Sequence, residues 1–242
     1  MKTAKLWTRN FRLVILASAM GTIGAIAGSF ALAFLVFDET GSTLASALIV
    51  AIQLLPYLLL PVLIAPLMDR LPRKAFLVAG DLANAALLAG MGLWLMAFDF
   101  SYVGYLALSL LLACLGAVDE LAFTSIYPEG AEEKGYAVSS MLYPILKVVM
   151  TPLAAVLLDT LGVAWILIAQ SVFSLAAAAT ESLIRLDETA RQQRAPYSLK
   201  AWGGDIREAV QYLKEERGLR SIYEYMAVTN GVANGFSPIL VA

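Results

Sequence analysis

Two uncharged stretches near the N-terminus most constrain what this chain can fold into. Leu13–Phe37 runs for 25 residues without a charged side chain, and Thr40–Met68 runs for 29. A helix of about 20 mostly apolar residues is long enough to cross the hydrocarbon core of a bilayer. Only Asp38 and Glu39 separate the two stretches, so the sequence predicts two membrane-spanning helices joined by a tight turn.

The composition indicates that the rest of the chain also lies largely in lipid. Apolar residues make up 60% of it and charged residues 15%, against roughly 45–50% and about 25% in soluble domains. A soluble protein of 242 residues has too small an interior to bury this apolar surface. We therefore predict an all-α, polytopic membrane protein. Four further spans are expected near residues 75–98, 102–127, 136–158 and 162–184, and a seventh apolar run extends from 219 to 242.

The residue inventory excludes several kinds of site. The chain has no histidine, which removes imidazole bases and histidine-ligated metals. Its single cysteine, Cys114, lies in an apolar run, so the sequence offers neither a disulfide framework nor a CxxC site. A formal net charge of −2 is not typical of a nucleic-acid-binding protein. We expect no metal, no cofactor, no nucleic-acid partner and no enzymatic activity, because the carboxylates are too scattered for a catalytic constellation.

The basic residues predict the orientation in the membrane. Of 17 Lys and Arg residues, 16 lie in the N-terminal tail, the loop at 69–74, Lys134 and the segment 185–220. The exception is Lys147, inside the fifth predicted span, and the alternate loops carry only acidic charges. Positively charged loops of membrane proteins face the cytoplasm. We therefore expect a cell-membrane protein whose N-terminus and long polar segment are cytoplasmic.

The polar segment itself contains a predicted amphipathic helix. Over residues 198–217, Ile206, Val210 and Leu213 recur at helical intervals among charged side chains. Such a helix lies along the membrane surface or on the inner mouth of a bundle. The predicted organisation is a six-helix bundle over residues 1–186, a cytoplasmic linker over 187–218 and the start of a seventh membrane helix over 219–242.

The loop between the second and third spans carries a recognisable pattern. It resembles the signature G-x-L-a-D-R-x-G-R-[RK] of the major facilitator superfamily, although Ala65 and Pro72 stand where that family has glycine. The order of six spans, a long basic linker and a seventh span resembles the N-terminal half of such a transporter and the start of its second half. The segments LVFDETGS and TSIYPEG resemble the drug and macrolide efflux branch. The signature positions that match are Leu67, Asp69, Arg70, Arg73 and Lys74.

This resemblance implies a secondary active transporter that works by alternating access in the lipid bilayer. It would export a small amphipathic molecule, such as a drug, macrolide or siderophore, in exchange for protons. The family's loop latches one conformation on the cytoplasmic side, and we carry that role over to Asp69, Arg70, Arg73 and Lys74. A second six-helix half is implied, in the same longer chain or in a partner chain. The alternative is a non-transporting or obligately paired half-transporter module.

Three charged residues inside predicted spans are candidates for proton or substrate coupling. Asp119 and Glu120 lie in the fourth span and Lys147 in the fifth. Each charge costs roughly 2.5–3.5 kcal/mol at mid-depth in a bilayer. At 1.5 Å per residue they lie ~11 and ~16 Å from the same membrane surface. Our hypothesis is that Lys147 pairs with one carboxylate and the other faces a cavity; the alternative is a purely structural ion pair.

Other positions carry weaker signals. Pro152, in Thr151-Pro152-Leu153-Ala154-Ala155, faintly resembles the antiporter motif G-P-x-x-G and predicts a bend in the fifth span. Glycines in the first span predict close packing against a neighbouring helix. The sequence leaves open whether Asp81 supports the 69–74 loop or reaches toward the headgroups. The glycines are Gly21, Gly24 and Gly28, and the candidate cavity dipoles are Gln53 and Gln170.

Overall fold

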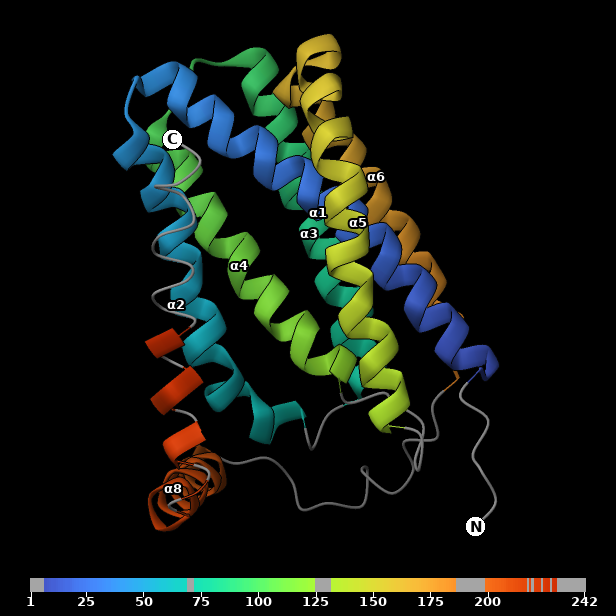
Figure 1. Ribbon diagram of the computed structural model, residues 1–242, viewed down its shortest axis with the longest axis vertical. Coiled ribbons are helices and arrows are strands. Elements are labelled where there is room, and N and C mark those ends of the chain that lie inside the picture. Colours follow the sequence, from blue (N-terminus) through green and yellow to red (C-terminus); the bar gives the residue numbers. More distant parts are fainter. Residues whose placement is uncertain are drawn as a thin grey trace.

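The computed structural model describes residues 7–68, 72–124, 132–185 and 199–216, together with several single residues between 218 and 229. Within these ranges every regular element is a helix (Figure 1). In chain order the helices are α1 (Arg9–Thr40), α2 (Thr43–Met68), α3 (Arg73–Ala97), α4 (Tyr102–Thr124), α5 (Glu132–Leu161), α6 (Val163–Ser182) and α8 (Leu199–Glu215).

The structure confirms the predicted all-α fold. Helices α1 to α6 are each long and apolar enough to cross a membrane, and they coincide with the six predicted spans to within a few residues. The predicted amphipathic helix is α8. Most of the seventh apolar run, over 219–242, lies outside the described residues.

Local sequence explains where several helices begin and end. Thr8 caps α1, because its Oγ1 accepts a hydrogen bond from the Phe11 backbone N–H at 3.2 Å. Gly41 ends α1 with a φ of 62°, a left-handed conformation that glycine adopts without steric cost. Gly162 separates α5 from α6 with a φ of 79°. These two glycines allow the tight connections that the sequence predicted at the acidic loops.

The helices do not pack in the order of the sequence. Helix α1 packs against α6 and α5, α3 packs against α6 and α4, and α2 packs mainly against α4. Going round the bundle, the packed order is therefore α2, α4, α3, α6, α1 and back to α2, and α5 packs on α1 and α6 (Figure 1). Consequently α4 and α5, which are consecutive in the chain, are not packed neighbours.

We call the end of the bundle where α1 and α3 begin, and where α2 and α6 end, the basic end. Arg9, Arg12, Arg73 and Lys74 all lie in the first turns of helices that begin there. Helix α8 lies at this end too, against α2 (Figure 1). The indole Nε1 of Trp202 in α8 donates a hydrogen bond to the Leu63 carbonyl of α2 at 2.8 Å.

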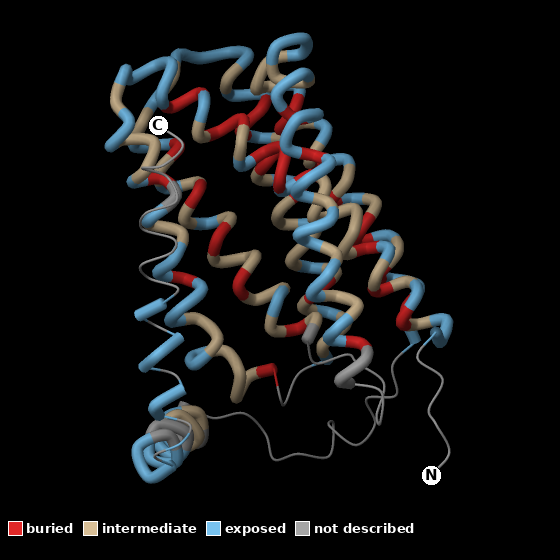
Figure 2. Tube along the Cα trace, viewed as in Figure 1, coloured by how far each residue is buried: buried red, intermediate tan, exposed pale blue. Residues whose placement is uncertain are grey.

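Buried positions are concentrated on the inward sides of four helices, α1, α3, α4 and α6 (Figure 2). Helices α2 and α5 are exposed over most of their length and expose mainly leucine, valine and tyrosine. Apolar side chains facing outward are the expected surface of a bundle solvated by lipid tails. The exposed surface is therefore consistent with a membrane location for the whole bundle.

The contact between α3 and α6 depends on Gly92, which has no side chain to hold the two backbones apart. A Cβ atom added at Gly92 of α3 would lie 2.9 Å from the Ala164 carbonyl oxygen and 2.8 Å from Cγ1 of Ile168, both in α6. Polar bonds cross the same interface: Ser171 Oγ donates to the Ala85 carbonyl at 2.8 Å, and Asn84 Nδ2 donates to Ser174 Oγ at 3.2 Å. Small residues and interhelical hydrogen bonds are the usual means by which helices associate in lipid.

We expect Gly92→Ala to destabilise the bundle, because the backbone of α6 would have to move away from α3. Overpacking of this kind costs about 1–3 kcal/mol. The matched control is Gly90→Ala, on the same helix, where an added Cβ meets nothing within 4 Å. Unfolding of the purified protein in detergent should show a lower Tm for Gly92→Ala only. Equal Tm values for the two variants would contradict this account of the interface.

Candidate functional site

A cavity of about 170 Å³ lies inside the bundle, between α1, α2, α3, α4 and α6. Its wall includes the side chains of Ser29, Gln53, Tyr57, Asp81, Asn84, Ser109, Asp119 and Gln170. Two of these, Asp81 and Asp119, are carboxylates, and Lys and Arg are absent from the described lining. The cavity is therefore a polar, acidic chamber inside an otherwise apolar bundle.

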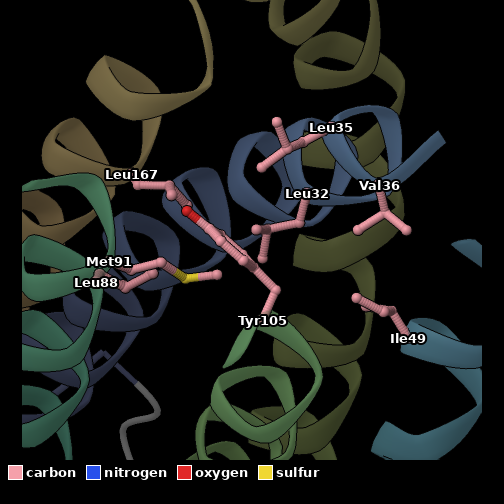
Figure 3. Packing of buried hydrophobic residues seen from close by; sticks show 8 residues of the cluster. All are labelled: Leu32, Leu35, Val36, Ile49, Leu88, Met91, Tyr105 and Leu167. Atoms are coloured by element: carbon pink, nitrogen blue, oxygen red, sulfur yellow. The ribbon is translucent and has the colours of Figure 1, made fainter. Parts of the chain in front are cut away.

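Apolar clusters lie on either side of this chamber along the bundle. At the end opposite the basic end, one cluster joins five helices (Figure 3). In Figure 3, Tyr105 extends from α4 between the helices toward Leu167 of α6. At the basic end, a smaller cluster joins α2, α3 and α4 through Met68, Leu77 and Ala122. The larger cluster consists of Leu32, Leu35, Val36, Ile49, Leu88, Met91, Tyr105 and Leu167.

Three carboxylates converge between the chamber and the basic end. Asp81 of α3 and Asp119 of α4 line the chamber and lie close enough for their charges to repel each other. Glu181, in the last turn of α6, is only 5% exposed and lies within electrostatic range of both. The described residues hold no group of three His, Cys, Asp or Glu side chains in a metal-binding arrangement.

Several polar atoms at this site are buried and unpaired. Asp119 Oδ1, Gln170 Oε1 and Ser109 Oγ have no hydrogen-bond partner within the described parts of the chain. Nearly all buried polar groups in folded proteins are hydrogen-bonded, and leaving one unpaired costs about 1–3 kcal/mol. All three residues line the same chamber, which makes it the candidate site.

Helical periodicity brings these side chains together, and it is a signal that the sequence contains. On α4, Ser109, Gly116 and Asp119 recur at intervals of seven and three residues and so share one face. On α2, Gln53 and Tyr57 stand four apart, and on α3 Asp81 and Asn84 stand three apart. Sequence reasoning identified Asp119 as a candidate, proposed Gln53 and Gln170 as dipoles, and missed Tyr57, Asn84 and Ser109.

Comparison with known families gives this arrangement a context. The family model described as Major Facilitator Superfamily matches residues 13–240. The chain belongs to the major facilitator superfamily. Curated proteins and solved structures gave no match. Membership confirms the predicted family in general terms: a multi-pass, all-α membrane protein that transports a small molecule across a lipid bilayer.

The predicted ion pair of this major facilitator protein is not present. Lys147 is exposed on α5, with its Nζ 5.6 Å from the centre of the Tyr143 ring, and it forms no salt bridge with either acid of α4, all three being described residues. The prediction assumed that helices consecutive in the chain are neighbours in space, whereas α4 packs between α2 and α3 and α5 packs on α1 and α6. Of the two acids, Asp119 lines the chamber and Glu120 is exposed.

The fifth helix lies away from the chamber. Helix α5 continues from Glu132 to Leu161 with Pro144 and Pro152 inside it, and none of its residues belongs to the described cavity wall. Thr151 Oγ1 donates to the Lys147 carbonyl at 2.7 Å, one turn earlier. The bend expected at Pro152 stays a prediction.

The major facilitator loop is described only at its end. Asp69 and Arg70 lie outside the described residues, whereas Arg73 and Lys74 form the first turn of α3. Lys74 Nζ donates to the Ser182 carbonyl at the end of α6 at 2.5 Å. This bond attaches the start of α3 to α6 within the same bundle.

A second attachment joins the start of α1 to the chain just after α6. Asn10 Nδ2 donates to the Arg185 carbonyl at 2.6 Å, and the Arg185 backbone N–H donates back to Asn10 Oδ1 at 3.2 Å. Together with the Lys74 bond, this pair fixes three helices to one another at the basic end. The signature-loop residue Lys74 therefore has a structural role in addition to the latch role that the resemblance implies.

We expect Lys147 and Asp119 to be energetically independent. In a double-mutant cycle of Lys147→Gln and Asp119→Asn, the changes in the free energy of unfolding should add to within about 0.5 kcal/mol, as for separated sites. The measurement is denaturant-induced unfolding of the wild type, both single variants and the double variant in one detergent. A coupling energy above about 1 kcal/mol would support an ion pair between the two residues after all.

Proposed function

We propose that this major facilitator protein exports a small amphipathic molecule in exchange for protons. The observation that carries the proposal is Asp119, whose carboxylate lines the chamber and has an unpaired buried oxygen within the described residues. A carboxylate in that position can hold either a proton or the positive end of a substrate. Occupation by one excludes the other, which is the requirement for exchanging the two across a membrane.

The proposed cycle follows from this competition. With the chamber accessible from the substrate side, the ionised Asp119 attracts a cationic group from the molecule to be exported. When the two halves of the transporter rock and the chamber faces the other side, a proton binds the carboxylate and the substrate leaves. Asp81 lies with Asp119 in the chamber wall, and Glu181 lies in the last turn of α6 at the basic end. They supply further groups that can pass the proton on.

The remaining parts of the proposal concern the context of the bundle. We place the basic end in the cytoplasm of a cell-membrane protein, because the described Lys and Arg side chains at helix starts gather there. A second six-helix half, in the same chain or in a partner chain, would rock against α1 to α6. Asp69, Arg70, Arg73 and Lys74 are proposed to latch one conformation at the basic end.

Transport in inside-out membrane vesicles tests the proposal. With the interior made acidic, vesicles from cells that express the protein should accumulate the cationic dye rhodamine 6G. A protonophore should abolish that accumulation. Asp119→Asn removes the carboxylate that carries the proposal, leaves Asp81 in the chamber wall, and should lower the initial rate at least tenfold.

The matched control is Glu120→Gln, which makes the same change of charge one residue further on, at an exposed position. Its rate should stay within about twofold of wild type, a difference of roughly 0.4 kcal/mol. Equal losses in both variants would argue against Asp119 as the coupling group. Accumulation that does not depend on the proton gradient would argue against antiport. Accumulation no greater than in control vesicles would favour a non-transporting module.

A further inference from the structure

The chamber wall offers hydrogen-bond acceptors that the described protein groups leave unused. The unpaired atoms are Asp119 Oδ1, Gln170 Oε1 and Ser109 Oγ. The Gln170 amide oxygen accepts only, the Asp119 oxygen accepts only when its carboxylate is ionised, and the Ser109 hydroxyl can accept as well as donate. Ser109 is 1% exposed, so bulk solvent does not reach it. An occupant with hydrogen-bond donors would therefore satisfy these acceptors.

Three glycines make room for polar side chains that line the chamber. A Cβ atom added at Gly28 of α1 would lie 1.7 Å from Gln170 Oε1, and one added at Gly24 would lie 2.9 Å from Gln170 Cγ. The amide of Gln170 therefore rests in a recess of α1 that only glycine provides. On the opposite wall, a Cβ atom at Gly116 would lie 2.5 Å from the hydroxyl oxygen of Tyr57.

The Gly28 recess sets the position of the amide more than it sets the distance between helices. The atom that a new methyl group would meet at Gly28 is the far end of a flexible side chain, which can move away. At Gly92, by contrast, the obstacle includes a backbone carbonyl. A methyl group at Gly28 is thus expected to displace the Gln170 amide while leaving α1 and α6 packed.

The charge of the chamber wall and its unpaired acceptors together indicate which chemical group would bind there. Lys and Arg are absent from the described lining, so an ionised Asp81 or Asp119 has no protein counter-ion there. A group that carries a positive charge and several N–H bonds satisfies both the charge and the unpaired acceptors. A quaternary ammonium ion supplies the charge alone and would leave those acceptors unpaired.

We propose that the chamber binds the N–H-bearing cationic end of an organic molecule, a primary ammonium, amidinium or guanidinium group, in preference to a quaternary ammonium. Asp119 provides the charge, and Gln170, seated against Gly28, provides the acceptor that detects N–H donors. This inference rests on the proposed function, since it names the chemical class of the transported molecule. It makes Gln170 the residue that sets specificity within the chamber.

Binding of two matched cations to the purified protein in lipid nanodiscs tests this inference. The probes are phenethylammonium and its N,N,N-trimethyl analogue, which have the same charge and the same hydrocarbon part. Isothermal titration calorimetry should give a Kd at least tenfold lower for the primary ammonium. Equal affinities, tighter binding of the trimethyl analogue, or no binding of either cation, as for a chamber that holds only water, would overturn the proposal.

Three variants locate the source of the preference. Gly28→Ala should displace the amide and Gln170→Leu should remove it, and each should lower the preference for the primary ammonium to below threefold. Affinity for the trimethyl analogue should persist in both, which verifies that the chamber is intact. The matched control is Gly21→Ala, an earlier glycine on α1, where an added Cβ meets nothing within 4 Å and the full preference should remain.

The outcomes separate this inference from the proposed function. If wild-type protein binds the primary ammonium preferentially but vesicles accumulate neither cation, the subsite stands and the transport proposal fails. If vesicles accumulate both cations equally, transport stands and the specificity of the subsite fails. A preference that survives unchanged in both Gly28→Ala and Gln170→Leu would remove Gln170 from its proposed role.

Discussion

The absence of water inside a bilayer is the constraint on which this structure depends. Backbone N–H and C=O groups cannot be left to solvent there, so each span closes its own hydrogen bonds as a helix. The same constraint applies to side chains: Ser171 and Asn84 both bond across the α3–α6 interface. In such a setting, three unpaired oxygens on residues that line one chamber, those of Asp119, Gln170 and Ser109, mark it as the candidate site.

Burial of large apolar side chains contributes less to helix association in lipid than in water, because lipid tails solvate leucine as well as a protein core does, so small residues matter at the interfaces. Glycine serves two distinct purposes here. At Gly92 it brings two backbones together, whereas at Gly28 and Gly116 it admits a polar side chain from another helix. Both uses appear in sequence as the same residue type, and only the neighbour in space distinguishes them.

Much of the fold could be predicted because its main signals are local. Long uncharged runs determine the six spans, and the helical spacing of Ile206, Val210 and Leu213 among charged side chains is enough to indicate α8. The site was harder to predict because it depends on which helices are neighbours. Lys147 and Asp119 lie at similar predicted depths, yet α4 and α5 do not pack together, and Gln170 meets Gly28 only because α6 lies against α1. The depth of a residue in the membrane can be read from its position along the chain, whereas the choice of neighbouring helices depends on packing between them.

The bond from Trp202 to the Leu63 carbonyl has a mechanical consequence. It attaches α8 to α2 at the Leu63 carbonyl, next to Val62, whose carbonyl lacks a helical donor because Pro66 has no N–H. The end of α6, by contrast, is held by Asn10 and Lys74. Through the Trp202 bond, a shift of α8 along the membrane would act on α2, which carries Gln53 and Tyr57 of the chamber wall.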